Sequence, residues 1–218
     1  MNTLATAPLD ALLDRLFSEA EAPPSPEFRA ALEQTSPEER DSLPEYLRFY
    51  SLAKTAYLAV SRETAQLLYM LVRSTGARHV VEFGTSFGIS TLHLAAGLRD
   101  NGGGRLITTE FEPSKIERAR QNFVAGGLAD LIEIREGDAL ETLARDLPEP
   151  IDILLLDGAK SLYLPVLKLL EGRLKPGTLI VADNTDKSPD YLALVRSAAD
   201  GYISVPFADD VELSMRAG

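Results

Sequence analysis

The 218-residue sequence contains no cysteine, which excludes disulfides, thiolate metal sites and cysteine nucleophiles. Positive charge is also scarce, since 22 Lys and Arg face 33 Asp and Glu and leave a net charge of −11. Nucleic-acid binding needs a surplus of Lys and Arg, so we expect a small-molecule partner instead. No apolar run approaches the roughly 20 residues that span a membrane. The first residues also lack the basic and apolar blocks of a secretory signal, so we expect a cytoplasmic protein.

Several catalytic signatures are missing as well. The sequence has neither the G-x-S-x-G turn of serine hydrolases nor the P-loop pattern that binds nucleotide phosphates. It contains two histidines, of which His79 begins an expected strand and His93 lies in an expected helix. We therefore expect both histidines to be structural.

Residues 1–57 are predicted to form a helical extension ahead of the main domain, residues 58–218. A proline after Ser25, and Ser36 spaced from Glu39 as in a capping box, are typical of helix starts. Ser61 and Gly76 are expected to begin and end a further helix. An apolar stripe near the N-terminus predicts a helix that caps the ligand pocket or packs against a second copy of the chain, and its members are Leu9, Leu12, Leu13, Leu16 and Phe17.

From residue 79 onward, short apolar runs alternate with helical stretches. This alternation predicts an α/β fold with a mostly parallel sheet and helices on both faces. The last two runs are separated by residues 206–210 alone, which is too short for a helical crossover, so they are predicted to form an antiparallel hairpin. The predicted strands are 79–83, 106–110, 131–134, 151–156, 178–182, 202–205 and 211–215, and the predicted helices are 89–99, 114–125, 139–146, 162–173 and 189–199.

Ligands of open α/β sheets bind beyond the carboxyl ends of the strands. The first strand ends at Glu82 and Phe83 and continues as Gly84-Thr85-Ser86-Phe87-Gly88. Glycines in such a turn let the backbone approach a ligand closely, although a plain strand–helix turn has the same composition. The G-x-x-x-G spacing differs from the G-x-G-x-x-G of dinucleotide-binding turns.

Single acids follow the next two strands. Glu110 can accept two hydrogen bonds from a ribose diol, or it is an exposed carboxylate at a strand end. Asp138 can accept from an adenine amino group, or it caps the following helix, which is the commoner role.

Oxygen donors also follow the fourth and fifth strands. Asp157 stands after the fourth strand, and Asp183 and Asn184 stand after the fifth. Carboxylate and amide oxygens suit Mg²⁺ or Ca²⁺, so their joint occurrence predicts a divalent-cation site, although each acid alone is more often a cap. Lys160, three residues beyond Asp157, can serve as a base in a cleft, or it is a solvated lysine.

In combination, these segments resemble the class I S-adenosylmethionine-dependent O-methyltransferases, and in particular the catechol and caffeoyl-CoA O-methyltransferase group. Residues 80–91, VVEFGTSFGIST, are similar to the group's first motif, E-x-G-x-x-x-G-x-S. Residues 106–113 resemble the second motif, residues 155–165 the metal and base segment, and residues 175–184 the last metal segment. The likeness extends from about residue 58 to the C-terminus.

The resemblance implies a Rossmann-like sheet of seven strands and methyl transfer from S-adenosylmethionine to a hydroxyl of a small aromatic vicinal diol. It implies that Asp157, Asp183 and Asn184 bind Mg²⁺ or another hard divalent cation, and that Lys160 accepts the substrate proton. The cofactor site that it implies consists of Val60, Glu82, Gly84, Thr85, Ser86, Gly88, Ser90, Glu110, Phe111, Asp138, Ala139 and Asp157, with Gln66 nearby.

Two features depart from the family pattern. Gly158 and Ala159 stand where catechol-type enzymes carry bulky residues, so we expect a wider acceptor pocket that lacks part of the usual adenine cover. A third acid on the substrate hydroxyl would come from Asp209, Asp210 or Glu212.

Three other hypotheses about the function are compatible with the sequence. They are a metal-independent methyltransferase of the same fold with another acceptor, an NAD(P)-dependent oxidoreductase, and a binding protein without catalytic activity. The G-x-x-x-G spacing and the lack of a Y-x-x-x-K pair disfavour the oxidoreductase.

Overall fold

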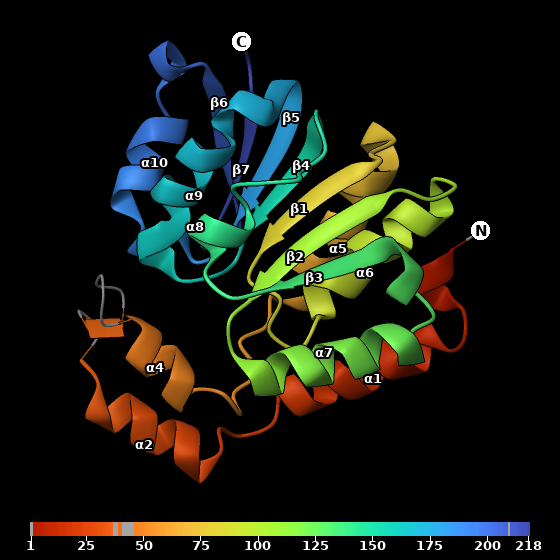
Figure 1. Ribbon diagram of the computed structural model, residues 1–218, viewed down its shortest axis with the longest axis vertical. Helices are drawn as coiled ribbons and strands as arrows, with labels where there is room; N and C mark the ends of the chain where they lie inside the picture. Colours follow the sequence, from red (N-terminus) through yellow and green to blue (C-terminus); the bar gives the residue numbers. More distant parts are fainter. Residues whose placement is uncertain (1, 37–38, 41–45, 209) are drawn as a thin grey trace.

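The computed structural model describes residues 2–36, 39–40, 46–208 and 210–218. Seven strands form one sheet in the order β3-β2-β1-β4-β5-β7-β6 (Figure 1). β1 to β5 run parallel, while β7 is antiparallel to both β5 and β6. The predicted sheet and its C-terminal hairpin are therefore confirmed. The strands are β1 (His79–Phe83), β2 (Arg105–Glu110), β3 (Ile132–Glu136), β4 (Ile151–Leu156), β5 (Leu174–Ala182), β6 (Tyr202–Phe207) and β7 (Val211–Arg216).

One face of the sheet is covered by α1 (Leu9–Ala20), α5 (Arg62–Thr75), α6 (Ile89–Asp100) and α7 (Pro113–Ala125). Their apolar side chains share one core with those of Val80, Leu106 and Leu155 from the strands. The stripe of α1 lies in this core, where Leu9 is 1% exposed and Leu16 is fully buried. The stripe itself therefore covers neither the ligand pocket nor a second copy, because the chain's own core buries it, whereas Tyr46, Leu47 and Tyr50 of the same N-terminal segment do line the pocket. A homodimer through other parts of the N-terminal segment stays a prediction.

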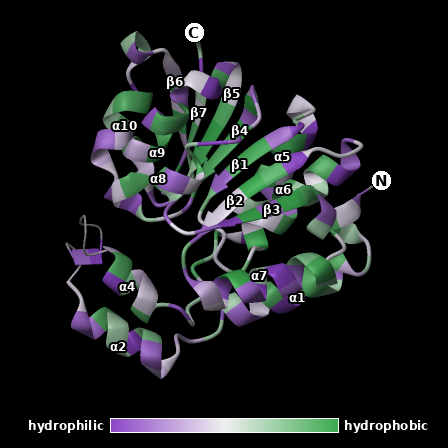
Figure 2. Ribbon diagram, viewed as in Figure 1, coloured by the Kyte–Doolittle hydropathy of each residue, from purple (hydrophilic) through white to green (hydrophobic). Residues whose placement is uncertain are grey.

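The opposite face is covered by α8 (Ala139–Thr142), α9 (Tyr163–Leu170) and α10 (Pro189–Val195). Their side chains pack on Val81, Ile107 and Leu154. β4 lies in the middle of the sheet and is apolar on both faces, as its continuous run of hydrophobic residues predicts (Figure 2). α8 is shorter than predicted, because the carbonyls of Thr142 and Arg145 accept hydrogen bonds from the Arg135 guanidinium, both at 2.6 Å.

The predicted helix starts at Ser25 and Ser61 and the helix end at Gly76 are confirmed, whereas most of the helix expected after Ser36 lies outside the described residues. The Ser25 hydroxyl accepts from the Phe28 amide at 3.1 Å and caps α2 (Pro26–Gln34). Ser36 and Glu39 form the reciprocal capping box, with bonds of 3.2 and 2.7 Å. Ser61 caps α5, and Gly76 ends it in a left-handed conformation. The other helices that the described residues define in full are α4 (Tyr46–Leu52) and the short 3-10 segments Thr3–Ala5, Ala129–Leu131, Lys160–Leu162, Glu171–Arg173, Thr185–Lys187 and Ala198–Asp200.

The N-terminal segment takes part in three hydrophobic clusters, one of which is the core on the α9 side of the sheet through Tyr46. α1 belongs to the core beneath the sheet, whereas α2 and α4 meet in a small cluster around Phe49 and Ala53. A domain boundary at residue 57 stays a prediction. Within the described ranges, no helix is long and apolar enough to cross a membrane.

Candidate active site

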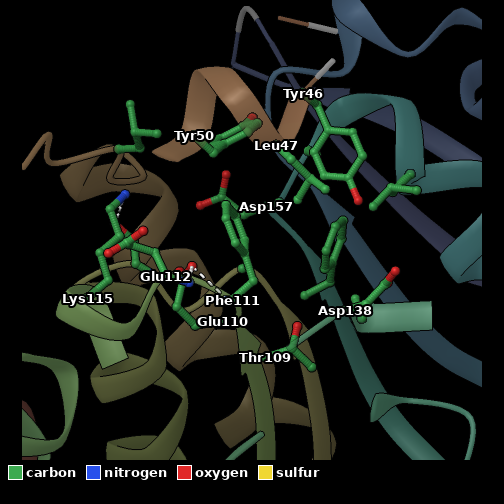
Figure 3. Close-up of a pocket in the computed structure, with 18 of the residues that line it drawn as sticks. Tyr46, Leu47, Tyr50, Thr109, Glu110, Phe111, Glu112, Lys115, Asp138 and Asp157 are labelled. Atoms are coloured by element: carbon green, nitrogen blue, oxygen red, sulfur yellow. Dashed lines mark hydrogen bonds between the residues drawn. The ribbon is translucent and has the colours of Figure 1, made fainter. Parts of the chain in front are cut away.

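A cavity opens at the carboxyl ends of the parallel strands, where the sequence predicts ligand binding. It encloses about 660 Å³ of empty space, part of it open to solvent. Its walls include the ends of β1, β2 and β4 together with Asp138 and Ala139 at the start of α8, and α4 closes the side opposite them (Figure 3). A smaller hollow, lined among others by Tyr57, Thr85 and Ser90, shares Ser86 and Asp157 with this cavity. The two spaces together could hold an elongated ligand that passes Asp157.

The glycine-rich turn after β1 is shaped by close packing against the protein itself. Gly84 has φ +106°, and a Cβ there would lie 2.4 Å from the Asp157 carbonyl oxygen. A Cβ at Gly88, which has φ +89°, would lie 2.4 Å from the Phe123 ring. Beyond the ends of the strands, the Asp157 amide donates to the Phe83 carbonyl at 2.8 Å. Only glycine therefore lets the turn after β1 and the loop after β4 lie this close.

Glu110, at the end of β2, is held in one orientation. Its carboxylate accepts hydrogen bonds from the backbone amides of Ser86, Phe111 and Glu112, at 2.9, 3.0 and 3.1 Å. Burial raises the pKa of this carboxyl, and the nearby Lys115 ammonium opposes the shift. Because it is half-buried and bonded, Glu110 is not the exposed strand-end acid of the alternative interpretation.

Lys115 is a cavity residue that the motif analysis missed. It is 3% exposed, and its Nζ lies 3.5 Å from the Ser86 hydroxyl and 5.5 Å from the centre of the Phe87 ring. Burial lowers the pKa of Lys115, while the Glu110 carboxylate opposes this. The sequence holds one clue, since Lys115 falls on the same helical stripe as the buried Ala119 of α7.

Asp138 both caps a helix and borders the cavity. Its Oδ1 accepts from the Leu140 amide at 2.8 Å, so the predicted cap of α8 is confirmed. Asp138, Ala139 and Phe111 all line the cavity, and contact of these residues with a bound base stays a prediction.

The predicted base lies in a buried hydrogen-bond network. Lys160 is 7% exposed, so it is not a solvated lysine. Its Nζ donates to Asp157 Oδ1 at 3.2 Å and to the Tyr163 hydroxyl at 2.8 Å. The Tyr163 hydroxyl in turn donates to the Asp183 carbonyl at 2.8 Å. Two bonds therefore fix the direction of the Lys160 side chain.

The carboxyl groups of Asp157 and Asp183 lie within hydrogen-bonding reach of each other. Burial, and then the negative charge of Asp157, raise the pKa of Asp183 to about 7. Two acids this close are stabilised by a shared proton or by a nearby positive charge, which Lys160 already supplies and which a hard metal ion could also supply. Within the described part of the chain, no group of three His, Cys, Asp or Glu is arranged for a metal ion, so a cation here also needs the Asn184 amide oxygen.

The three candidates for a third acid differ in their surroundings. Asp209 lies outside the described residues. Glu212 is 1% exposed and binds the Arg196 guanidinium through two bonds of 2.8 and 2.6 Å. Asp210 accepts from the Asn184 side-chain amide at 2.9 Å, and its charge helps to raise the pKa of Asp183. Asp210 is thus the described candidate beside the oxygen donors.

Other predicted cofactor residues lie behind the cavity. Glu82 is fully buried and accepts from the hydroxyls of Ser90 and Thr91, each at 2.6 Å. Val60 is 3% exposed and borders a surface hollow outside the cavity, and Gln66 borders a different one. Glu82 thus acts on the site by orienting Ser90, and direct cofactor contact by Val60 stays a prediction.

We expect Glu82→Gln to change how stability depends on pH. Burial raises the pKa of Glu82 from 4.5 to about 7. The unfolded chain therefore ionises first, and the wild type loses stability as pH rises between these values, by up to about 3 kcal/mol. Glutamine mimics the protonated acid and does not ionise. Urea unfolding at pH 5 and pH 8 should show the variant gaining stability relative to the wild type as pH rises, and parallel pH profiles would contradict this.

Comparisons with known proteins identify the family to which the chain belongs. The O-methyltransferase family profile matches residues 33–189. The chain belongs to the O-methyltransferase family. It is 32% identical over 171 residues to a catechol O-methyltransferase of Mycobacterium tuberculosis, covering 78% of this chain and 77% of that protein. It is 35% identical over 130 residues to a catechol O-methyltransferase of Niastella koreensis, which covers 58% of each.

The fold of the chain also matches that of a solved O-methyltransferase structure. The O-methyltransferase TomG from Streptomyces achromogenes, in complex with S-adenosylmethionine, superposes with a TM-score of 0.64 and 25% identity, covering 94% of this chain and 96% of TomG. The prediction of a Rossmann-like, S-adenosylmethionine-dependent O-methyltransferase is confirmed, and the oxidoreductase and the catalytically inactive binding protein are set aside.

Proposed function

We propose that this O-methyltransferase methylates one hydroxyl of a small aromatic vicinal diol, and that the reaction depends on Mg²⁺ or another hard divalent cation. The observation that carries the proposal is that Lys160, buried beside the cavity, bonds to Asp157, and that Asp183 follows the neighbouring strand close enough for its pKa to be raised by the charge of Asp157. The catechol O-methyltransferases among its relatives support the same acceptor class.

The cavity and the adjoining hollow suit the two ends of S-adenosylmethionine. Its sulfonium supplies an electrophilic methyl group. Glu110, fixed by three backbone amides, is suited to accept hydrogen bonds from the ribose hydroxyls. Asp138 and Ala139 would meet the adenine edge, and Ser90 would bind the methionine end from the smaller hollow.

Methyl transfer requires the hydroxyl of the acceptor to lose its proton. Asp157, Asp183 and Asn184 would hold the cation, which makes a bound hydroxyl more acidic. Lys160, aimed by Asp157 and Tyr163, would first have to lose a proton to solvent; its neutral amine would then take the hydroxyl proton as the oxygen attacks the methyl group and S-adenosylhomocysteine leaves. Fixing both reactants in line can supply roughly 7–11 kcal/mol of the barrier reduction.

One observation favours a second candidate, a metal-independent methyltransferase with another acceptor. The Lys160 ammonium lies 3.2 Å from Asp157 and already supplies a positive charge at the carboxylate pair. In that case the two acids would serve mainly to position Lys160.

Removal of divalent cations separates these candidates. With catechol as acceptor, we expect EDTA to lower turnover by more than about a hundredfold, because loss of a metal or its supporting ligands has effects of at least this order. Excess Mg²⁺ should restore the rate, and phenol, which has a single hydroxyl, should be a poor acceptor under all conditions. The measurement is transfer of a labelled methyl group. Full turnover of catechol in EDTA would refute the metal mechanism and favour the second candidate.

A further inference from the structure

One wall of the cavity comes from the N-terminal segment. Tyr46, Leu47 and Tyr50 of α4 line the cavity opposite Phe111 and Asp138 (Figure 3). Tyr46 and Tyr50 are four residues apart, so they lie on the same face of the helix. This face brings two phenol rings to the space above the strand ends.

Tyr46 lies at the rim of the cavity, near Asp138 and Ala139, where the edge of the adenine ring is predicted to bind. It is 9% exposed and belongs to the apolar cluster that contains Ala139 and Ala159. Burial and the charge of Asp138 raise the pKa of Tyr46, and Figure 3 shows both side chains at the same side of the cavity. Tyr46 therefore borders the same part of the cavity as Asp138 and Ala139.

Tyr50 completes an aromatic group across the opening. Its ring centre lies 6.5 Å from that of Phe111, with the rings nearly perpendicular at 87°. Figure 3 shows the Asp157 carboxylate directed toward Tyr50 from below. The ring centre of Tyr50 is also 6.5 Å from that of Tyr46, with the two rings inclined at 69°, so α4 presents two adjacent aromatic rings to the cavity.

The loop after β4 supplies no comparable cover. Gly158 and Ala159 are small, and a Cβ at Gly158 would lie 2.4 Å from the Phe83 ring. A larger residue at 158 would have to displace Phe83 from the cavity wall. The aromatic surface on this side must therefore come from another segment.

α4 is held in place independently of any ligand. Its Phe49 is 7% exposed and lies 6.3 Å from the Phe28 ring of α2, centre to centre. The Arg40 guanidinium lies 5.5 Å from the centre of the Phe49 ring on a further side. With Phe49 anchored, Tyr46 and Tyr50 are left to face the cavity.

We propose that Tyr46 and Tyr50 of α4 bind the adenine ring of S-adenosylmethionine and provide the cover that Gly158 and Ala159 cannot. The inference rests on the proposed assignment of Glu110 and Asp138 to the adenosine. Flat aromatic surfaces favour a nucleobase through stacking, and Asp138 on the same wall can accept from its amino group.

Affinity measurements test the proposal. By calorimetry, Tyr46→Leu and Tyr50→Leu should each weaken S-adenosylhomocysteine binding by about tenfold or more, since stacking on a base is worth this much. Tyr46→Phe keeps the ring and should keep most of the affinity. At saturating S-adenosylmethionine, the KM for catechol should stay the same. Unchanged S-adenosylhomocysteine affinity with a raised KM for catechol would overturn the proposal and assign α4 to the acceptor.

Glu110→Gln, measured in parallel, distinguishes a wrong assignment of the cavity to the adenosine from a wrong role for α4. If Glu110→Gln also leaves S-adenosylhomocysteine binding intact, the assignment of the cavity to the adenosine is wrong. If Glu110→Gln weakens binding and the tyrosine variants do not, only the role of α4 is wrong.

A fluorescence probe avoids large changes to the packed rings. The chain contains no tryptophan, so Leu47→Trp places a single fluorophore on α4, at a side chain that is 45% exposed. Adenosine and S-adenosylhomocysteine should each change its emission in a saturable manner. The matched control is Val124→Trp on α7, at a side chain that is 70% exposed and away from the cavity, whose emission should not respond. A Leu47→Trp emission that stays constant while calorimetry shows binding would contradict the proposal.

Discussion

Asp183→Ala is expected to lower turnover of a vicinal diol by more than about a hundredfold, a loss at least as large as that from removing residues that support a metal ligand. Asp183 is 7% exposed, and its carboxyl lies within hydrogen-bonding reach of Asp157. Its removal takes away one of the oxygen donors proposed for the cation. Asp183 does not line the cavity or the adjoining hollow, so S-adenosylhomocysteine affinity should change little. Methyl-transfer assays and calorimetry measure the two effects.

Two controls sharpen this result. Asp186→Ala removes an exposed acid three positions further along the chain and should keep full turnover. Asp157→Ala is the less selective variant, because Asp157 lines both spaces and its loss should weaken cofactor binding as well. Turnover of Asp183→Ala near the wild-type rate, with unchanged response to Mg²⁺, would show that Asp183 is not a ligand.

Lys160→Met is expected to lower kcat by about 10²- to 10⁴-fold, the range for loss of a positioned general base. The ammonium lies between Asp157 and the Tyr163 hydroxyl, at 3.2 and 2.8 Å. Methionine has a similar length but accepts no proton. Because the substitution leaves Asp157 buried without its partner, the melting temperature must be measured beside kcat to show that the variant is folded.

Lys160→Arg distinguishes a base from a counter-charge. Arginine can keep the ion pair with Asp157, but its guanidinium stays protonated in proteins and cannot accept a proton. Both Lys160 variants should therefore be slow. Lys168→Met, at an exposed lysine of α9, is the matched control and should keep normal turnover. Near-normal turnover of Lys160→Arg would show that position 160 needs only positive charge.

The architecture could be predicted because local patterns determine it. The uninterrupted apolar run of β4 requires burial on both faces, and its residues 153–156 are fully buried. The short link between β6 and β7 permits only an antiparallel neighbour, as the register confirms. Asp157 and Asp183 come close together because the ends of the adjacent parallel strands β4 and β5 lie side by side, whereas their joint binding of a cation with Asn184 stays a prediction.

Other parts of the site depend on contacts between distant segments. The position of Tyr46 over the strand ends follows from its place in the hydrophobic cluster that also contains Ala139 and Ala159, which are far from it in the sequence and which no local spacing links to it. The choice between Asp210 and Glu212 depends on Arg196, which lies 16 residues before Glu212 and binds it. The link from Glu82 to Ser90 likewise joins a strand to the next helix and appears only once the chain is folded.

The close packing of Gly84 against the backbone of Asp157 also bears on engineering this enzyme. The turn that would face the donor and the loop that carries Asp157 and Lys160 are joined main chain to main chain, so neither can be redesigned without disturbing the other. Directed evolution toward new acceptors should therefore keep Gly84 and the backbone of Asp157 unchanged and vary side chains that do not touch this junction.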